Sequence, residues 1–425
     1  MDDSNLGEKF RLLASSVIPA QAGIQVRATS PTHGYRPSPV WRTLSATWML
    51  VFTGMTEISR VVFLLLSALL LVVGAPAHAA DAWQSEWERT IKAAEQEGEF
   101  TYYTLGEVGF IGEFERKFPR IKARVVQGKG NELLTRIMAE RRGGRFLADV
   151  ARIGNTSPYA LYQAKALQAM PPAFILPEVK DESKWWSGKH QYIDSESKYI
   201  FVPVGSVSVN MVAYNSEMVA PAELHSFWDL LHEKWRAKIV VIDPRATGYG
   251  RSGARAAYFH PQLGSEFLRR LFSEQVVMIS RDYRQAIDWL AQKRFSVMLF
   301  GNGDDVLQAR AQGLPVNVVD TGVWKEGGML EPGAFTIAWA DKSPHPNASK
   351  VFINWLLSRD GQLAVQRDGG INDSLRLDIS KSDLRPMARR KDGAKYVVTW
   401  KEEYIDAEPM QKVVSQALAR GARKN

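Results

Sequence analysis

The sequence predicts an α/β protein with two lobes, and three observations support this prediction. From Trp83 onward, amphipathic helices alternate with short apolar strands, as a mainly parallel sheet requires. A second series of the same kind follows a long β-rich stretch at 199–215. With 425 residues, 45% of them hydrophobic, the chain is long enough to bury two cores rather than one.

The first series contains three βα units in succession. Its opening helix, 82–98, places Trp83, Trp87 and Ile91 on one face and ends at Gly98, a residue that commonly stops a helix. The expected strands then span 99–105, 122–128 and 148–154, and the expected helices span 110–119 and 130–144. Three such units favour a mainly parallel sheet.

The second series predicts the other lobe. Residues 226–244 indicate a helix and then a strand, 285–293 a helix, and 315–320 a last strand. Between the helix at 285–293 and the strand at 315–320, the sequence "RFSVMLF" is typical of a buried strand, which is interrupted by "GNGDD". Further along the chain, residues 333–370 predict a strand and an amphipathic helix. We therefore expect a discontinuous first lobe, 80–208 and 330–425, and a second lobe, 209–329.

The first eighty residues have the pattern of a secretory signal that follows an unrelated extension. An apolar run at 61–74 is too short to span a membrane, and Ala77-His78-Ala79 matches an A-x-A cleavage site. We expect a signal peptide at 55–79, cleaved after Ala79 or Ala80, and a mature chain free in a bacterial periplasm. Residues 1–54 are expected to be a non-native extension, with a genuine long presequence as the alternative.

Composition excludes several classes of function. The chain has no cysteine, which excludes disulfides, thiolate metal sites, cysteine nucleophiles and a lipid-modified N-terminal cysteine. The net charge of +8 comes without a Lys/Arg tract interleaved with aromatics, so we expect a solvated basic surface and no nucleic-acid partner. Neither H-E-x-x-H nor a P-loop occurs. We expect a monomeric binding protein without a cofactor, not an enzyme.

Three segments carry a resemblance to a known family. "VGSVSVNMVAYN", "KWRAKIVVIDP" and "HPNASKVFINWLLSRDGQ" resemble the periplasmic solute-binding proteins of ABC importers, in particular the iron(III)-type branch, and the resemblance covers about 83–375. It implies a type II binding-protein fold with two crossing hinge strands that closes on a solute and delivers it to a permease in the inner membrane. An enzyme that has recruited this fold, or the ligand-presenting partner of a sensor, remains an alternative.

The candidate ligand-binding residues follow the predicted strands. In an open α/β lobe, ligands bind outside the carboxyl ends of the strands, and alternate residues of a crossing strand share a face. The candidates chosen in this way are Tyr103, Thr104, Glu107, Asn155, Ser206, Ser208, Asn210, Thr247, Gly248, Tyr249, Ser280, Arg281, Asn302, Gly303 and Asp304.

Structural alternatives exist for several of these candidates. Tyr103 would equally pack in the core. The turn at 243–254 would hold an anion on backbone N–H groups, with Arg245 or Arg251 adding a charge. Alternatively, this turn is glycine-rich for conformational reasons alone. Asp282 is better interpreted as a helix N-cap.

The tip "FGNGDD" gives evidence about the chemical class of the solute. Relatives of the iron branch place two adjacent tyrosines here, whereas this chain has Asn302 and Gly303. Phenolate oxygens are hard donors for a trivalent ion, so their loss favours a small polar, anionic organic solute, with Gly301 and Gly303 admitting it close to the backbone. The alternatives are a carboxylate-based iron site using Glu107, Asp304 and Asp305, and a plain strand-to-helix turn with Asp304 or Asp305 as N-cap.

Overall fold

We analysed a computed structural model of the chain that describes residues 75–106 and 108–423. The expected extension, 1–54, and nearly all of the expected signal peptide lie outside the described residues. The first described helix, α3 (Ala75–Glu97), begins seven residues before the expected start at 82, because the preceding segment is rich in alanine, the strongest helix former. Within the described ranges, no helix is long and apolar enough to cross a membrane.

The first sheet has the predicted parallel centre. Strands β1 (Glu99–Thr104), β2 (Lys122–Gln127), β3 (Val150–Arg152), β13 (Ile337–Ala340) and β4 (Leu167–Gln168) run in the order β2-β1-β3-β13-β4, and β5 (Ile200–Phe201) also pairs with β13. Strand β1 pairs parallel to β2 and β3, whereas β13 is antiparallel to β3. Apart from the start of α3, the predicted helices and strands of this series are confirmed to within two residues.

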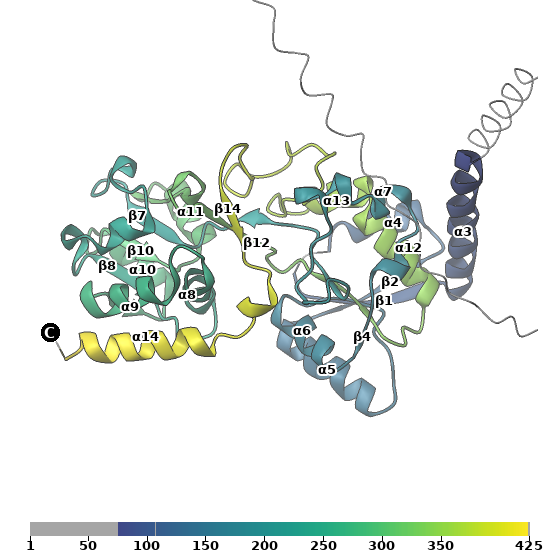
Figure 1. Cartoon of the computed structure of the whole chain (residues 1–425), viewed down its shortest axis with the longest axis horizontal. Coiled ribbons are helices and arrows are strands. Elements are labelled where there is room, and N and C mark those ends of the chain that lie inside the picture. Colours follow the sequence, from purple (N-terminus) through teal and green to yellow (C-terminus); the bar gives the residue numbers. More distant parts are fainter. Residues whose placement is uncertain (1–74, 107, 424–425) are drawn as a thin grey trace, which may run out of the picture. The chain divides into compact units, whose positions relative to one another are not determined.

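Helices pack around this sheet and form the first core (Figure 1). They are α4 (Ile111–Lys117), α5 (Gly130–Arg142), α6 (Thr156–Gln163), α7 (Pro177–Lys180), α12 (Pro346–Leu357) and α13 (Arg359–Arg367). Helix α12 starts with proline in its first turn and buries an aromatic stripe. The ring of its Phe352 lies 4.5 Å from that of Phe100 on β1 and 5.3 Å from that of Phe114 on α4, measured between centroids.

The second sheet brings three strand ends to one edge. Strands β7 (Val212–Asn215), β8 (Ile239–Ile242), β9 (Met278–Ser280), β10 (Val297–Leu299) and β11 (Val316–Val318) run in the order β11-β7-β10-β8-β9. Its helices are α8 (Tyr249–Phe259), α9 (Gly264–Glu274), α10 (Tyr283–Ala291) and α11 (Gly303–Ala311). Strands β8, β9 and β10 are parallel, so α8, α10 and α11 all begin at their shared carboxyl edge.

One predicted helix of this series was wrong in type. The segment before β8 forms two 3₁₀ helices, Phe227–Leu231 and Glu233–Trp235, instead of one α-helix. Its buried residues Phe227 and Leu230 are three apart, a spacing that places them on one face of a 3₁₀ helix.

A small third sheet links the two larger ones. Strand β12 (Gly328–Glu331) pairs antiparallel with β6 (Ser206–Val207) and parallel with β14 (Tyr396–Val398). The resemblance implied two crossing strands, β6 and β12, and β14 adds a third. We call these three strands the linking sheet.

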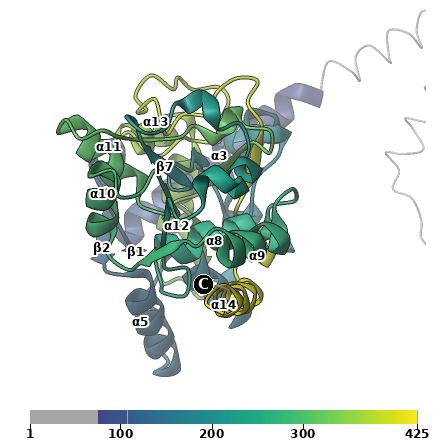
Figure 2. The same cartoon turned by 90° about the vertical axis from the view of Figure 1, so that its left-hand side faces the viewer.

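The third strand leads to a C-terminal helix in the second core. Helix α14 (Glu408–Gly421) lies beside α9 in both views, and its Met410, Val414 and Ala417 are buried in that core (Figures 1 and 2). The sequence placed all of 330–425 in the first lobe, and α14 departs from this because its apolar face is covered by α9. The remaining lobe boundaries stay a prediction.

Candidate functional site

The carboxyl edge of the second sheet gathers most of the predicted site residues. Strands β8, β9 and β10 end at Ile242, Ser280 and Leu299, and the N-termini of α8, α10 and α11 follow directly. Neighbouring strands lie roughly 4.8 Å apart, so three adjacent strand ends fall within reach of one small solute. We call this the second-sheet edge.

One end of this edge is held by arginines. The Asp243 side chain is 1% exposed, and Arg245 donates to both its oxygens at 2.8 and 3.0 Å while Arg281 donates at 3.0 Å. Burial alone would favour the neutral acid, but these hydrogen bonds lower the pKa of Asp243 to about 2. Two guanidinium groups on one carboxylate leave a net positive charge, and the Arg281 side chain is 76% exposed. Asp243, Arg245 and Arg281 form the arginine end.

The residues next to the arginine end stabilise the turns between strands and helices. Ser280 is buried and its hydroxyl donates to the carbonyl of Asp282, whose carboxylate accepts from the N–H of Gln285 as the α10 N-cap. The cap interpretation of Asp282 is therefore confirmed, whereas Ser280 supports the turn and does not face a solute. Thr247 and Gly248 are exposed. Gly248 has a φ of 131°, a conformation that side chains rarely adopt.

The other end of the edge is acidic. Tyr249 opens α8 and is 37% exposed, and its ring lies edge-on to that of Tyr283, 5.6 Å away between centroids. Burial of the phenol and then the carboxylates of Asp304, Asp305 and Glu331 raise the pKa of Tyr249. Asp304 is exposed. Tyr249, Asp304, Asp305 and Glu331 form the acidic end.

Glu331 joins the linking sheet to α11. The Ser208 hydroxyl donates to one Glu331 oxygen at 2.7 Å, and the Asn210 amide donates to the other at 3.4 Å. The Asn210 oxygen in turn accepts from the N–H of Gly303 at 3.0 Å. Burial raises the pKa of Glu331, opposed by these two hydrogen bonds and by Arg255. The predicted Ser208, Asn210 and Gly303 thus meet around a carboxylate that the sequence analysis missed.

The tip "FGNGDD" begins α11. The Asn302 side chain accepts from the N–H of Asp304 at 3.2 Å, so Asn302 is the N-cap, and the alternative with Asp304 or Asp305 as cap named the wrong residue. A Cβ on Gly303 would lie 2.2 Å from the carbonyl of Val209. This glycine lets α11 approach the crossing chain, instead of admitting a ligand as expected. Gly301 faces the side chain of Met298 in the same way.

An arginine occupies the corresponding edge of the first sheet. Arg152, at the end of β3, donates to the Thr104 hydroxyl at 2.9 Å and to the Leu105 carbonyl at 2.5 Å, and it lies 4.5 Å from the Phe335 ring centroid. Thr104 is fully buried and supports this guanidinium, so it does not face a solute. A charged residue inside the apolar run "ADVARIG" was the signal that could have indicated Arg152.

The other first-lobe candidates have separate environments. Tyr103 is buried against α5 and donates to Glu140 at 2.8 Å, so the packing alternative is right; burial and Glu140 raise its pKa to about 12. Ser206 donates to the carbonyl of Ile371 at 2.5 Å, which anchors a neighbouring loop. The Asn155 side-chain oxygen is buried without a hydrogen-bond partner among the described residues. Glu107 lies outside them.

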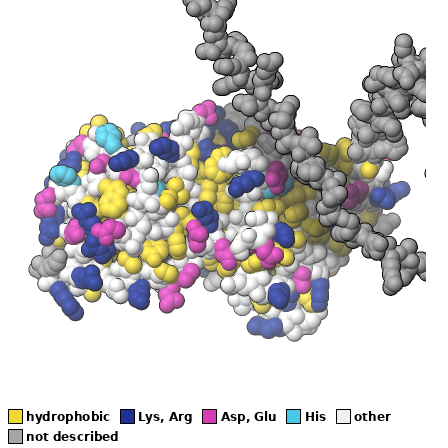
Figure 3. Space-filling view, viewed as in Figure 1, with side chains coloured by type: hydrophobic (Ala, Val, Ile, Leu, Met, Phe, Trp, Pro, Cys, Tyr) yellow, Lys and Arg dark blue, Asp and Glu magenta, His cyan; other side chains and the backbone are white. Residues whose placement is uncertain are grey.

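A preformed metal centre of acidic and imidazole groups is not present in the described ranges. No group of three or more histidine, aspartate or glutamate side chains converges there. Glu107, expected as a ligand, lies outside the described residues. Basic and acidic side chains are interspersed on the face shown in Figure 3. The expectation of no nucleic-acid partner stays a prediction.

The fold and this edge define a solute-binding protein with two α/β lobes, and comparison supplies the family. The model of the bacterial extracellular solute-binding protein family matches residues 96–363. The chain belongs to this family. It is the substrate-binding component of an ABC transporter and acts outside the cytoplasm. The comparison with curated protein sequences gave no match.

Solved structures share the fold at low identity. Apo FutA2 from Synechocystis PCC6803 is 14% identical with a TM-score of 0.57, over 75% of this chain and 98% of that one. IdiA (FutA) from Trichodesmium, in complex with iron and citrate, is 16% identical with a TM-score of 0.55, over 77% and 99%. The ferric binding protein from Campylobacter jejuni is 14% identical with a TM-score of 0.54, over 75% and 99%.

Proposed function

We propose that this importer subunit captures a solute that combines a cationic centre with an anionic periphery, best represented by ferric iron in a small anionic chelate. The observation that carries the proposal is the division of the second-sheet edge into an acidic end and an arginine end. The acidic end offers the phenol of Tyr249 and the carboxylates of Asp304 and Asp305, which are hard oxygen donors that suit a trivalent ion. The arginine end would receive the carboxylates of the chelator.

This proposal revises the anionic organic solute that the sequence favoured. Arg245 and Arg281 are held by Asp243, which moderates their attraction for a free anion. The two carboxylates at the start of α11 stand beside the exposed phenol of Tyr249 and would repel an anion there. The absent tyrosine pair at 302 and 303 is therefore weaker evidence against iron than the sequence suggested, because a phenol arrives from α8 instead.

The comparisons add support at the level of the fold. The Trichodesmium relative holds iron and citrate, a ferric ion with an anionic chelator, and the Campylobacter relative is a ferric binding protein. At identities of 14–16%, these likenesses leave the solute to experiment.

The remaining parts of the proposal concern the location of the protein, its oligomeric state and its membrane partner. We infer a signal peptide at 55–79 that directs the mature chain to the periplasm, where it acts as a monomer and delivers its solute to a permease in the inner membrane. It binds without catalysis, since its sequence contains none of the nucleophile or metal motifs sought.

Thermal unfolding of the mature chain tests the solute class. Ferric citrate is expected to raise the unfolding temperature saturably, whereas citrate alone and glucose 6-phosphate at equal concentration are not. The double variant Asp304→Asn/Asp305→Asn should lose at least about tenfold in ferric citrate affinity, since it loses two charges next to the metal.

The matched control removes two exposed carboxylates away from the edge, with Glu88→Gln/Asp383→Asn, and should bind like the wild type. Equal stabilisation by glucose 6-phosphate, undiminished in the Asp304/Asp305 variant, would contradict the proposal.

A further inference from the structure

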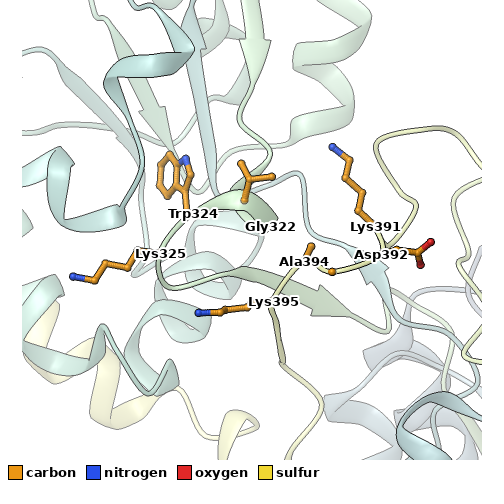
Figure 4. Close-up of a pocket in the computed structure, with 9 residues that line it drawn as sticks. Gly322, Trp324, Lys325, Lys391, Asp392, Ala394 and Lys395 are labelled. Carbon is orange, nitrogen blue, oxygen red and sulfur yellow. The ribbon is translucent and has the colours of Figure 1, made fainter.

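A hollow of about 490 Å³ lies beside the linking sheet and shares no lining residue with the second-sheet edge. Two loops line it, 322–325 before β12 and 391–395 before β14 (Figure 4). Three lysines, Lys325, Lys391 and Lys395, and one acid, Asp392, come from these loops. Its volume lies within the range of small-molecule sites in proteins.

Lys391 connects the two loops that line the hollow. Its ammonium pairs with Asp320, and its backbone N–H donates to the Tyr396 hydroxyl at 2.9 Å. These contacts hold the loop before β14 against the loop before β12. Lys391 is therefore already neutralised by a carboxylate.

Lys325 and Lys395 are different, because neither forms an ion pair within residues 75–106 and 108–423. Both are exposed, and in Figure 4 their side chains extend to the same side of the hollow, whereas Asp392 lies on the other side. Neither ammonium group has a carboxylate within ion-pair distance in the described part of the chain.

Backbone pairing joins the two loops that carry these lysines. Gly328 and Tyr396 are partners in the parallel pair β12–β14, and the Gly328 N–H donates to the Lys395 carbonyl at 2.9 Å. A Cβ on Gly327 would lie 2.7 Å from that carbonyl, so glycine permits the close approach. The pairing thus fixes the loop that carries Lys395 beside Gly327 and Gly328, which closely follow Lys325 in the chain, so that both lysines line one hollow.

We propose that this hollow is a binding site for a small multivalent anion, of the phosphate or polycarboxylate class, held by Lys325 and Lys395. Lysine binds such groups as a point charge, and an anion with two charged oxygens can meet both ammonium groups. The bound anion joins the loops that precede two strands of the linking sheet. Its occupancy therefore stabilises the β12–β14 pairing, independently of the solute at the second-sheet edge.

Calorimetric titration with inorganic pyrophosphate at constant ionic strength tests the site. The mature chain is expected to bind one equivalent saturably, and Lys325→Ala/Lys395→Ala to bind at least about tenfold more weakly. The control Lys92→Ala/Lys180→Ala removes two exposed lysines of the first lobe and should leave the affinity unchanged.

Two further measurements test whether the hollow itself holds the anion. The Asp304→Asn/Asp305→Asn protein is expected to keep its pyrophosphate affinity, which separates this site from the solute site. Equal binding by wild type and Lys325/Lys395 variant, or no saturable binding at all, would overturn the proposal. Binding of a polyglutamate peptide without any response to pyrophosphate would also overturn it, in favour of docking by an acidic protein segment.

Discussion

The arginine end and the acidic end occupy the same sheet edge, yet they use carboxylates in opposite ways. Asp243 is buried under two arginines, and its pKa falls to about 2. Glu331 is partly buried, with a hydroxyl and an amide as its hydrogen-bond partners, and desolvation raises its pKa. Both carboxylates are thus occupied by partners within the protein, Asp243 in the turns and Glu331 between the linking sheet and α11. This leaves the carboxylates of Asp304 and Asp305, beside Tyr249, available to a solute.

The largest effect is expected from breaking the arginine end. Asp243→Asn leaves two arginines without their shared carboxylate and should lower the free energy of unfolding by about 2 kcal/mol, measured by urea denaturation at pH 7. The same variant should still bind ferric citrate once folded, because the acidic end is intact. A loss of binding without a loss of stability would reverse the roles assigned to the two ends.

The pH dependence of stability sharpens this prediction. Because the folded-state pKa of Asp243 is lowered from 3.8 to about 2, its contribution is fully present above pH 4 and is lost as pH falls toward 2. Urea midpoints collected from pH 5 to pH 2 should fall more steeply for the wild type than for Asp243→Asn. Parallel curves would show that the arginines do not stabilise the ionised form.

An intermediate effect is expected where the cap of α11 is removed. Asn302→Ala deletes the side-chain acceptor for the Asp304 N–H and should cost about 1 kcal/mol of stability, measured by urea denaturation. Asn302→Asp keeps a cap acceptor and is the matched control. If both variants lost equal stability, the amide of Asn302 would have a role beyond capping.

The smallest change in stability is expected at Glu331. Because burial raises its folded-state pKa, its favourable contribution is present below the unfolded-state pKa and is lost as pH rises through the folded-state value. Glu331→Gln should therefore be no less stable than the wild type at pH 7, while binding ferric citrate more weakly. A large loss of stability at neutral pH would mean that the ionised carboxylate holds the linking sheet to α11.

Local patterns predicted the elements better than the contacts between them. The spacing of hydrophobic residues and the capping residues in the sequence were enough to place the strands of the first sheet and the helix cap at Asp282. The Ser208–Glu331 contact joins residues 123 positions apart, and the docking of α14 on α9 likewise depends on packing between distant segments. No local period encodes either contact, which is why Glu331 and the third strand of the linking sheet were missed.

The contacts between the residues of the candidate site could not be predicted for the same reason. Tyr249 was predicted within a turn that joins a strand to a helix, and the structure makes it the first residue of α8. Its neighbourhood with Asp304 and Asp305 arises from the strand order β10-β8-β9. Looking for adjacent tyrosines in the sequence could not reveal a phenol and two carboxylates that different helices bring together.

The central claim is that the acidic end binds the metal of a ferric complex through Tyr249. Titration of the mature chain with ferric citrate, followed by visible absorption, tests it directly, because iron(III) bound to a phenolate absorbs visible light. We expect a saturable phenolate-to-iron band in the wild type and in the control Tyr162→Phe, and no such band in Tyr249→Phe. An equal band in Tyr249→Phe, or binding of ferric citrate without any band in the wild type, would contradict it.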